Sequence, residues 1–267
     1  AMAGDRFRCV VTNALGSATS SGVRLSLIAS STPATSAGPL IKTTWNNYQW
    51  PLNAYYPLDP AGGAEGLGYR IGNACGPSSI TRILRYWEYP RHGAGGINFT
   101  AGNGAHWQAD FSAADYRYDQ MPYDLPATAT EAVYGPTATL SFHAAAAMED
   151  WGGSGMDTQW LRRMFVNYFR YAPQAYEACR WQYSREEWIA LLKSELDAGH
   201  PLLVMVRTAI SPAPWQPGNF DGHWFVIDGY NNQDKFHYAY GYGIPYPEYC
   251  DVDDIGNYNS YHTVLIG

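Results

Sequence analysis

The chain is poor in charged residues, has only four cysteines and contains no long apolar run, and each scarcity argues against a class of protein. Lys, Arg, Asp and Glu make up 15% of its 267 residues and hydrophobic residues 46%, which disfavours extended disorder and favours a sizeable core. The net charge of -7 lacks the basic excess that a nucleic-acid partner requires. No stretch approaches the roughly 18 apolar residues of a membrane span. We therefore predict a globular protein with no nucleic-acid partner and no membrane span.

Aromatic residues, in contrast, are abundant. They make up 15% of the chain, with 22 Tyr and 10 Trp. Such a composition, combined with few charges, is typical of secreted proteins and of clefts that bind polymers. The length allows one large domain, or one domain with a smaller appendage.

The first 39 residues predict a small appendage followed by a linker. Residues 5–27 alternate as two strands around a turn that contains Gly16. The stretch DRFRCVVTNALG resembles the F strand and F–G turn of an immunoglobulin-like domain, in which Cys9 would pair with a cysteine on an earlier strand. Two strands cannot form an independent domain. We therefore interpret residues 1–28 as the C-terminal strands of an immunoglobulin-like module, docked or dangling, and the Ser/Thr/Ala/Pro-rich residues 29–39 as a linker.

Residues 40–267 place helical patterns first and strand patterns last, which predicts an α+β domain. The predicted helices cover 79–87, 129–149 with an interruption at Gly135 and Pro136, 158–169, and the segment between a Ser184–Glu187 capping box and Gly199. The predicted strands cover 201–207, 223–230, 234–243 and 261–267. The Gly-rich residues 92–107 are interpreted as a mobile loop near a cleft.

Cys75 lies where the helical pattern of residues 79–87 begins, in the stretch GNACGPSSI. Unpaired N–H groups and the positive end of the helix dipole favour a thiolate and stabilise an oxyanion at such a position. The alternative is a small buried residue without chemistry, which is the commoner fate of a cysteine. The position therefore predicts either a buried structural cysteine or a nucleophile with a lowered pKa.

His223 heads the strand pattern HWFVIDGY. A histidine at a strand start is often no more than a polar terminus. However, a cysteine on a helix followed about 150 residues later by a histidine on a strand is the layout of papain-like cysteine proteases. The pair therefore favours the nucleophile hypothesis for Cys75, with His223 as its base.

Several motifs together resemble the streptopain family of secreted bacterial cysteine peptidases, over residues 40–267. TTWNNYQWPLNAYYP resembles the W-x-Q-x-x-P-Y-N segment of that family, and ACGPSSITRILRYW resembles its nucleophile helix. YDQMP, AVYGPTATL, SREEWIALLKSELDAGHPLLV, DGHWFVIDGY and FHYAYGYG follow in family order, the last resembling F-H-x-N-W-G-W-G. The resemblance implies a papain-like fold, with Cys in the helical part and His on an antiparallel sheet. The Cys-Gly-Pro-Ser start also resembles the bacteriocin-processing peptidases.

The resemblance implies catalytic roles for particular residues. Cys75 would be the nucleophile, and His223 the general base and later the general acid. Spacing from Trp45 places the oxyanion-hole glutamine of the family at Asn47, whereas an insertion before Pro51 aligns it with Gln49, which we favour. The backbone N–H of Cys75 would be the second donor.

The aromatic-glycine motif implies a supporting role for Tyr240 and Tyr242, which replace family tryptophans that shield the catalytic histidine. In the same motif Ala239 stands where the family has the asparagine that orients the imidazole, and a methyl group accepts no hydrogen bond. A backbone carbonyl, a water or Asn231 would have to substitute. We expect a weakened but real peptidase.

The remaining cysteines are Cys9, Cys179 and Cys250, and the last two are a possible disulfide pair in a secreted protein. The sequence thus predicts a monomeric, secreted bacterial cysteine endopeptidase that acts on protein or peptide substrates with no cofactor and no metal. Two alternatives stay open: a peptide-binding module that has lost turnover, and an amidase acting on cell-wall peptides.

Overall fold

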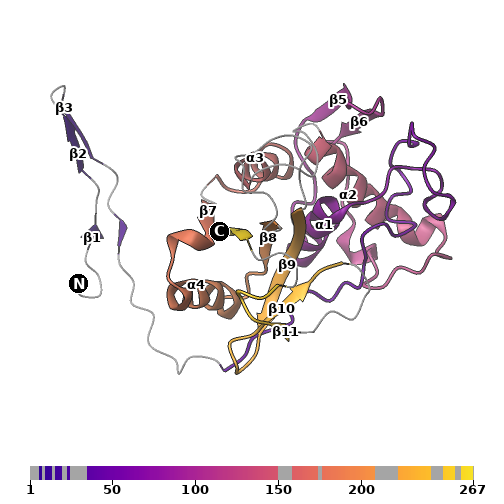
Figure 1. Ribbon diagram of the computed structural model, residues 1–267. Coiled ribbons are helices and arrows are strands. Elements are labelled where there is room, and N and C mark those ends of the chain that lie inside the picture. Colours follow the sequence, from indigo (N-terminus) through magenta and orange to yellow (C-terminus); the bar gives the residue numbers. More distant parts are fainter. Residues whose placement is uncertain are drawn as a thin grey trace. The chain divides into compact units, whose positions relative to one another are not determined.

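The computed structural model describes residues 6–7, 10–13, 16–19, 23–24, 35–149, 158–173, 176–207, 222–241, 249–255 and 260–266. These residues form two compact units, which divide between Thr35 and Ser36 (Figure 1). Each unit is described by itself.

The smaller unit is an antiparallel hairpin in four short pieces. Its strands are β1 (Arg6–Phe7), β2 (Val10–Asn13), β3 (Gly16–Thr19) and β4 (Val23–Arg24). β1 pairs with β4 and β2 pairs with β3, so both predicted strands are present, each in two pieces. Cys9 lies outside the described residues, and the assignment of this hairpin to an immunoglobulin-like module stays a prediction.

The larger unit is built on a six-stranded antiparallel sheet with the order β11-β10-β9-β8-β12-β7. Side chains alternate between its faces, so each face contributes to a separate core. Trp224 and Val226 of β9 belong to the core on one face, and Phe225 and Ile227 to the core on the other. The strands are β7 (Tyr176–Cys179), β8 (Leu202–Arg207), β9 (Gly222–Tyr230), β10 (Phe236–Ala239), β11 (Tyr249–Cys250) and β12 (Ser260–Ile266).

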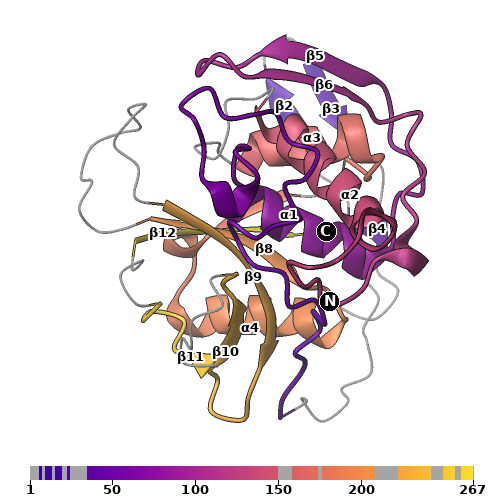
Figure 2. The same ribbon diagram turned by 90° about the vertical axis from the view of Figure 1, so that its right-hand side faces the viewer.

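Helices cover both faces of this sheet. α1 (Cys75–Trp87), α2 (Glu131–Glu149) and α3 (Thr158–Phe169) contribute to the first core, and α4 (Arg185–Asp197) to the second. Figure 2 shows α1 on one side of β8 and β9 and α4 on the other. Short 3-10 turns η1 (Glu65–Leu67), η2 (Tyr118–Gln120) and η4 (Arg180–Gln182) lie in the connections. The predicted helices and strands are therefore present in the predicted order. In the described part of the chain no helix is long and apolar enough to cross a membrane.

The predicted interruption of the second helix is wrong. α2 runs without a break from Glu131 to Glu149 with Pro136 inside it. Proline removes one backbone hydrogen bond and normally kinks or ends a helix. Here the helix continues because the turns after Pro136 are buried: Leu140 and Ala144–Met148 expose at most 1% of their surface.

The interpretation of residues 92–107 as a mobile loop is also wrong. Gly96–Thr100 (β5) and His106–Asp110 (β6) form an antiparallel hairpin, with Phe99 opposite Trp107. Trp107 is 1% exposed and stacks on Phe142 of α2 at a centroid distance of 5.9 Å. The glycine-rich sequence thus forms a strand pair, and Trp107, Ala105 and Ala109 bury its inner face.

α1 carries its predicted apolar stripe with one exception. Ile80, Ile83 and Leu84 are buried, whereas Trp87 at the end of the helix is 42% exposed. The neighbouring side of the helix faces β9, because Ser79 Oγ donates to the carbonyl of Trp224 at 3.1 Å. α1 thus joins the helical half of the unit to the sheet.

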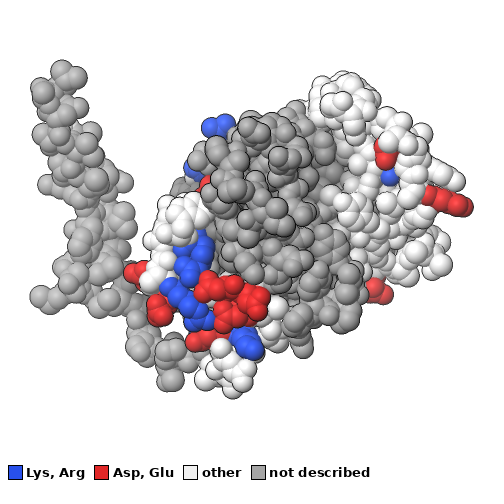
Figure 3. Space-filling view, in the orientation of Figure 1, with Lys and Arg blue, Asp and Glu red and all other residues white. Residues whose placement is uncertain are grey.

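α4 begins as predicted with a capping box. Ser184 Oγ accepts the N–H of Glu187, and the carboxylate of Glu187 accepts the N–H of Ser184. Beside this helix Arg180 and Arg185 form ion pairs with Asp251 and Asp253, and Figure 3 shows basic and acidic side chains intermingled on that face. These aspartates are therefore paired with arginines.

Part of the predicted linker is attached to the sheet. Ala37 forms a bridge with Tyr230, and the N–H of Leu40 donates to the carbonyl of Asp228 at 2.8 Å. The N–H of Ile41 donates to a carboxylate oxygen of Asp228 at 2.8 Å. Residues 36–39 thus belong to the larger unit, where they run along β9.

Candidate active site

Cys75 is the first residue of α1, as predicted from the sequence. Its N-cap, Ala74, has no side chain that caps the helix. The backbone N–H groups of Trp224, Gly76 and Cys75 itself instead lie near the sulfur and act to lower its pKa. Trp224 immediately follows His223, so the thiol touches the strand that carries the predicted base.

The net pKa direction at Cys75 is opposite to the predicted one. Burial raises the pKa of the Cys75 thiol, and the three backbone N–H groups oppose this effect without overcoming it. Desolvation penalises the thiolate, whereas N–H donors and the helix dipole stabilise it. The helix position alone therefore does not produce a thiolate here, because the partial burial of Cys75 outweighs the effect of the N–H groups.

Asn73 fixes the loop before Cys75 and is a residue that the sequence reasoning missed. Its Nδ2 donates to the carbonyl of Asn46 at 2.9 Å and to Ser78 Oγ at 3.0 Å. Its Oδ1 accepts the N–H of Gln49 at 2.9 Å, and the side chain is fully buried. One amide thus ties the segment around Gln49 to the first turn of α1. Only the position of Asn73, two residues before the cysteine, could have indicated it.

His223 is fully buried at the start of β9. Its Nε2 lies 3.1 Å from the carbonyl oxygen of Tyr240, and the two rings stack at 5.8 Å with an interplanar angle of 11°. Burial lowers the pKa of His223 to about 4, the Tyr240 carbonyl opposes this shift, and the charge of Arg82 adds to it. The imidazole is therefore neutral at neutral pH.

The carbonyl of Tyr240 fixes the tautomer of His223. A carbonyl oxygen can only accept, so the neutral imidazole that bonds to it through Nε2 carries its proton on Nε2. The lone pair is then on Nδ1, which is the state a general base needs. The oriented ring does not use Asn231, whose side-chain oxygen accepts the N–H groups of Gln233 and Lys235 in the β9–β10 turn. A backbone carbonyl thus occupies the place left by Ala239.

The two candidates for the oxyanion hole have different surroundings. Gln49 Nε2 donates to the carbonyl of Leu125 at 2.7 Å, and its Oε1 accepts the N–H of Asn46 at 2.6 Å. Asn47 is 8% exposed and donates through Nδ2 to the Tyr240 carbonyl at 3.4 Å. Asn47 therefore bonds the same carbonyl as His223 Nε2, whereas Gln49 is held in the loop that Asn73 joins to α1. Tyr242, the second predicted shield, lies outside the described residues.

Comparison with known proteins decides the family. The model of the peptidase C10 family matches residues 45–249, a stretch that includes both Cys75 and His223. The chain belongs to the peptidase C10 family. The predicted kinship with streptopain is confirmed, because streptopain of Streptococcus pyogenes serotype M1 is 19% identical over 222 residues, or 75% of this chain and 53% of streptopain.

A second relative and two solved structures agree with this assignment. The thiol protease/hemagglutinin PrtT of Porphyromonas gingivalis is 23% identical over 201 residues, which is 73% of this chain and 21% of PrtT. The structure of active wild-type interpain A cysteine protease of Prevotella intermedia superposes with a TM-score of 0.71 and 27% identity, over 87% of this chain and 94% of that one. A prointerpain A fragment gives 0.69 and 25%, over 87% and 72%. The predicted papain-like α+β fold is confirmed. The chain spans about half the length of streptopain and about a fifth of PrtT.

The possible disulfide of this C10 chain is absent. Cys179 and Cys250 do not bridge each other. They lie on β7 and β11, the two opposite edges of the six-stranded sheet. Five spacings of about 4.8 Å separate these edges, whereas bridged Cα atoms lie about 4.4–6.8 Å apart. Spacing along the sequence gave no information on this separation.

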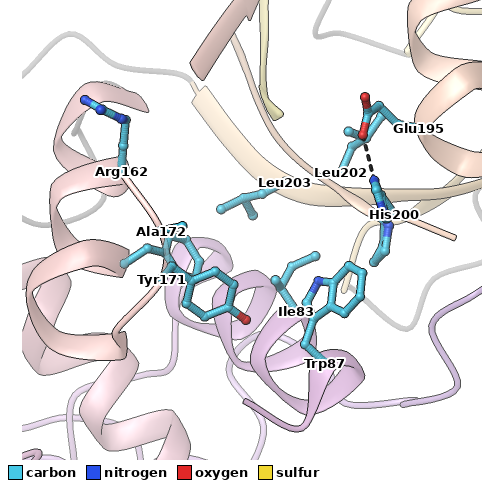
Figure 4. A pocket seen from close by; sticks show the side chains of 11 residues that line it. Ile83, Trp87, Arg162, Tyr171, Ala172, Glu195, His200, Leu202 and Leu203 are labelled. Atoms are coloured by element: carbon cyan, nitrogen blue, oxygen red, sulfur yellow. Dashed lines mark hydrogen bonds and ion pairs between the residues drawn. The ribbon is translucent and has the colours of Figure 1, made fainter. Parts of the chain in front are cut away.

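A cavity of about 120 Å³ lies apart from the candidate active site of this C10 chain. Its lining includes Ile83 and Trp87 of α1, Tyr171, His200 and Leu203, as Figure 4 shows. Cys75 and His223 are absent from that lining. Because a helix rises about 1.5 Å per residue, Ile83 lies roughly 12 Å along α1 from Cys75. The cavity is therefore distinct from the site where a scissile bond would meet the thiol.

Proposed function

We propose that the chain is a cysteine endopeptidase that hydrolyses peptide bonds through a Cys75 thioester, with His223 as general base and acid. The observation that carries the proposal is the contact between the Cys75 sulfur and the N–H of Trp224, next to a histidine whose tautomer is fixed by the Tyr240 carbonyl. Membership of the C10 family supports the reaction class.

The first half-reaction begins from a neutral pair. Because burial raises the pKa of Cys75 and lowers that of His223, the resting site holds a thiol and an imidazole. The Sγ–H proton passes to Nδ1 of His223 as the sulfur bonds to the peptide carbonyl carbon. The imidazolium then gives this proton to the leaving amine, the C–N bond breaks, and an acyl thioester remains on Cys75.

The second half-reaction releases the acid product. His223 Nδ1 accepts a proton from water as the water oxygen bonds to the thioester carbon, and the departing Cys75 sulfur regains a proton. In both halves the negative oxygen of the tetrahedral intermediate needs donors. The N–H of Cys75 would be one, and the Gln49 carboxamide the other, through the second of its two Nε2 hydrogens, since one donates to Leu125.

The relatives named above come from bacteria, and the aromatic-rich, charge-poor composition suits an exported enzyme. We accordingly propose a secreted bacterial protein that acts on polypeptides as a monomer. Membership of a peptidase family weighs against the two alternatives, a binding module without turnover and a cell-wall amidase.

The test compares wild type with Cys75→Ala and Cys250→Ser on a fluorogenic peptide library. Wild type and Cys250→Ser should cleave peptides, whereas Cys75→Ala should not. An epoxide thiol inhibitor should abolish cleavage and label Cys75, as read by peptide mapping. Wild type that binds library peptides without cleaving them would favour the binding module. Cleavage of cell-wall peptides alone would favour the amidase.

A further inference from the structure

The turn at residues 239–241 is the mount of His223. Tyr240 supplies both the carbonyl that bonds Nε2, at 3.1 Å, and the ring that stacks on the imidazole. Because Ala239 has no acceptor in its side chain, the imidazole follows the main chain of this turn. The position of the turn therefore sets the direction of the lone pair on Nδ1.

Each carbonyl of this turn accepts a hydrogen bond from outside it. Arg82 Nη1 donates to the Ala239 carbonyl at 2.8 Å. Asn47 Nδ2 donates to the Tyr240 carbonyl at 3.4 Å, and the N–H of Asn47 donates to the Gly241 carbonyl at 2.5 Å. Two residues far apart in the sequence thus hold three consecutive carbonyls.

Arg82 lies on the same side of α1 as Cys75. Seven residues make almost two turns of a helix, so Cys75, Ser79 and Arg82 share the face that meets β9 and the 239–241 turn. Ser79 bonds the carbonyl of Trp224 from this face. One rigid helix therefore carries the nucleophile at its start and the support of the base two turns later.

The burial of Arg82 calls for a reason of this kind. Arg82 is 3% exposed. Burial lowers the pKa of its guanidinium to about 10, so the group stays charged at neutral pH. Arginine is rarely buried without partners, because its desolvation is costly. The negative charge of Asp228, itself fully buried and bonded to His237 and Ile41, offsets part of this cost.

The fit around Gly241 is tight. A Cβ added there would lie 2.7 Å from Asn47 Oδ1 and 2.9 Å from Arg82 Nη2. The residue also has φ +80°, which favours glycine. The guanidinium and the carboxamide therefore pack directly against the main chain of the turn.

We propose that Arg82, together with Asn47, is a positioning residue for His223 that acts through the main chain of residues 239–241 and replaces the orienting side chain missing at Ala239. The inference rests on the proposed function, because it assigns Arg82 a role in orienting the base of that reaction.

The experiment measures the ring of His223 directly, so that it does not depend on turnover. The full chain labelled with 15N-histidine should show His223 as the Nε2–H tautomer in wild type. In Arg82→Met the ring should populate both tautomers. On a cleaved fluorogenic peptide, kcat should fall about 10- to 100-fold, because small misplacements of a catalytic group have effects of this size, while KM changes less than about 2-fold. Adding Ala239→Asn to Arg82→Met should recover most of the lost kcat.

Arg85→Met is the matched control. Arg85 is also buried on α1, and its hydrogen bonds go to the carbonyl of Met121 and the carboxylate of Glu88 rather than to the 239–241 turn. It should lower stability and leave the His223 tautomer and kcat unchanged. If Arg82→Met does not fold, Gly241→Ala disturbs the same clamp with Arg82 in place and should give the same two changes.

The outcomes separate this inference from the proposed function. The positioning role is overturned if Arg82→Met shows the same His223 tautomer as Arg85→Met. If Arg82→Met does not fold, Gly241→Ala takes its place in this comparison. Given a wild type that cleaves peptides, the role is also overturned if Arg82→Met loses the single tautomer and adding Ala239→Asn does not recover kcat. If wild type does not cleave peptides, the proposed function fails, and the tautomer comparison alone decides the inference.

Discussion

Among the described residues of the larger unit two histidines are buried, one on a helix and one on the sheet, and they are alike in burial but not in partner. His143 of α2 is 6% exposed and His223 of β9 is fully buried, and burial lowers the pKa of each to about 4. His143 Nδ1 lies 2.7 Å from the hydroxyl of Tyr116, which can donate or accept. His223 Nε2 faces a carbonyl, which can only accept. A shifted pKa alone therefore does not distinguish the two; the proposal of His223 as the base rests on its fixed tautomer and on its place next to Trp224.

The largest expected effect comes from exchanging each histidine in turn. His223→Asn should lower kcat by at least about 10³-fold, because general base catalysis is lost. His143→Asn should leave kcat within about 2-fold and lower the free energy of unfolding by about 1–3 kcal/mol, through its buried hydrogen bond. Steady-state kinetics and urea unfolding of both variants provide the test. Equal loss of kcat in the two would remove the distinction between them.

The next effect concerns the thiol beside the neutral His223. Because burial raises the pKa of Cys75 and no imidazolium accompanies it at neutral pH, alkylation by iodoacetamide should accelerate by up to about 100-fold between pH 7 and pH 9. Mass-spectrometric mapping of Cys75 at each pH gives the rates, with Cys250 as the internal reference. A rate already at its plateau at pH 6 would mean that thiolate and imidazolium form an ion pair in solution.

Both histidines should make the protein sensitive to acid. Their folded-state pKa values of about 4 lie below the ordinary histidine value of 6.5, so between these two pH values the unfolded chain binds more protons than the folded one. Stability is then complete above about pH 6.5 and falls as the pH drops toward 4, by up to about 3 kcal/mol per histidine. His143→Gln, which does not titrate, should halve this loss in urea unfolding at pH 4.5 against pH 7.5. An undiminished loss would assign the acid sensitivity to other groups.

The smallest effect should come from Ala239→Asn in the otherwise unchanged chain. The Tyr240 carbonyl already orients the ring, so an asparagine oxygen at 239 should raise kcat only about 2- to 5-fold, with KM nearly constant, because it refines an existing orientation. Initial rates over a range of peptide concentrations provide the measurement. An increase of about 100-fold or more would mean that the carbonyl orients His223 poorly.

The features predicted from the sequence are those that depend on local pattern. The start of α1 at Cys75, the capping box of Ser184 and Glu187, and β9 behind His223 follow from turn residues, caps and hydrophobic period. These signals act within one element, so one sequence suffices to find them.

The features that were missed depend on contacts between distant segments. Arg82 occupies a helix position that looks polar and solvent-facing, yet it is buried and bonds the carbonyl of Ala239, more than 150 positions later. The β5–β6 hairpin has a glycine-rich sequence that does not resemble strands, and Trp107 packs on Phe142 of α2. The pKa direction expected for Cys75 was wrong for the same reason. The helix terminus can be recognised in the sequence, whereas the burial that raises the pKa comes from distant segments.

Asn73 shows how little chemical freedom such a contact leaves. Its amide presents hydrogens to Asn46 and Ser78 from one end and a lone pair to the N–H of Gln49 from the other. Aspartate has almost the same shape, but its negative oxygen would face the carbonyl oxygen of Asn46. Leucine would fill the space but would leave the hydrogen-bonding groups of Asn46, Ser78 and Gln49 without this partner. Among the twenty side chains only asparagine has this size with donors at one end and an acceptor at the other. The loop that leads into Cys75 therefore admits only asparagine at position 73.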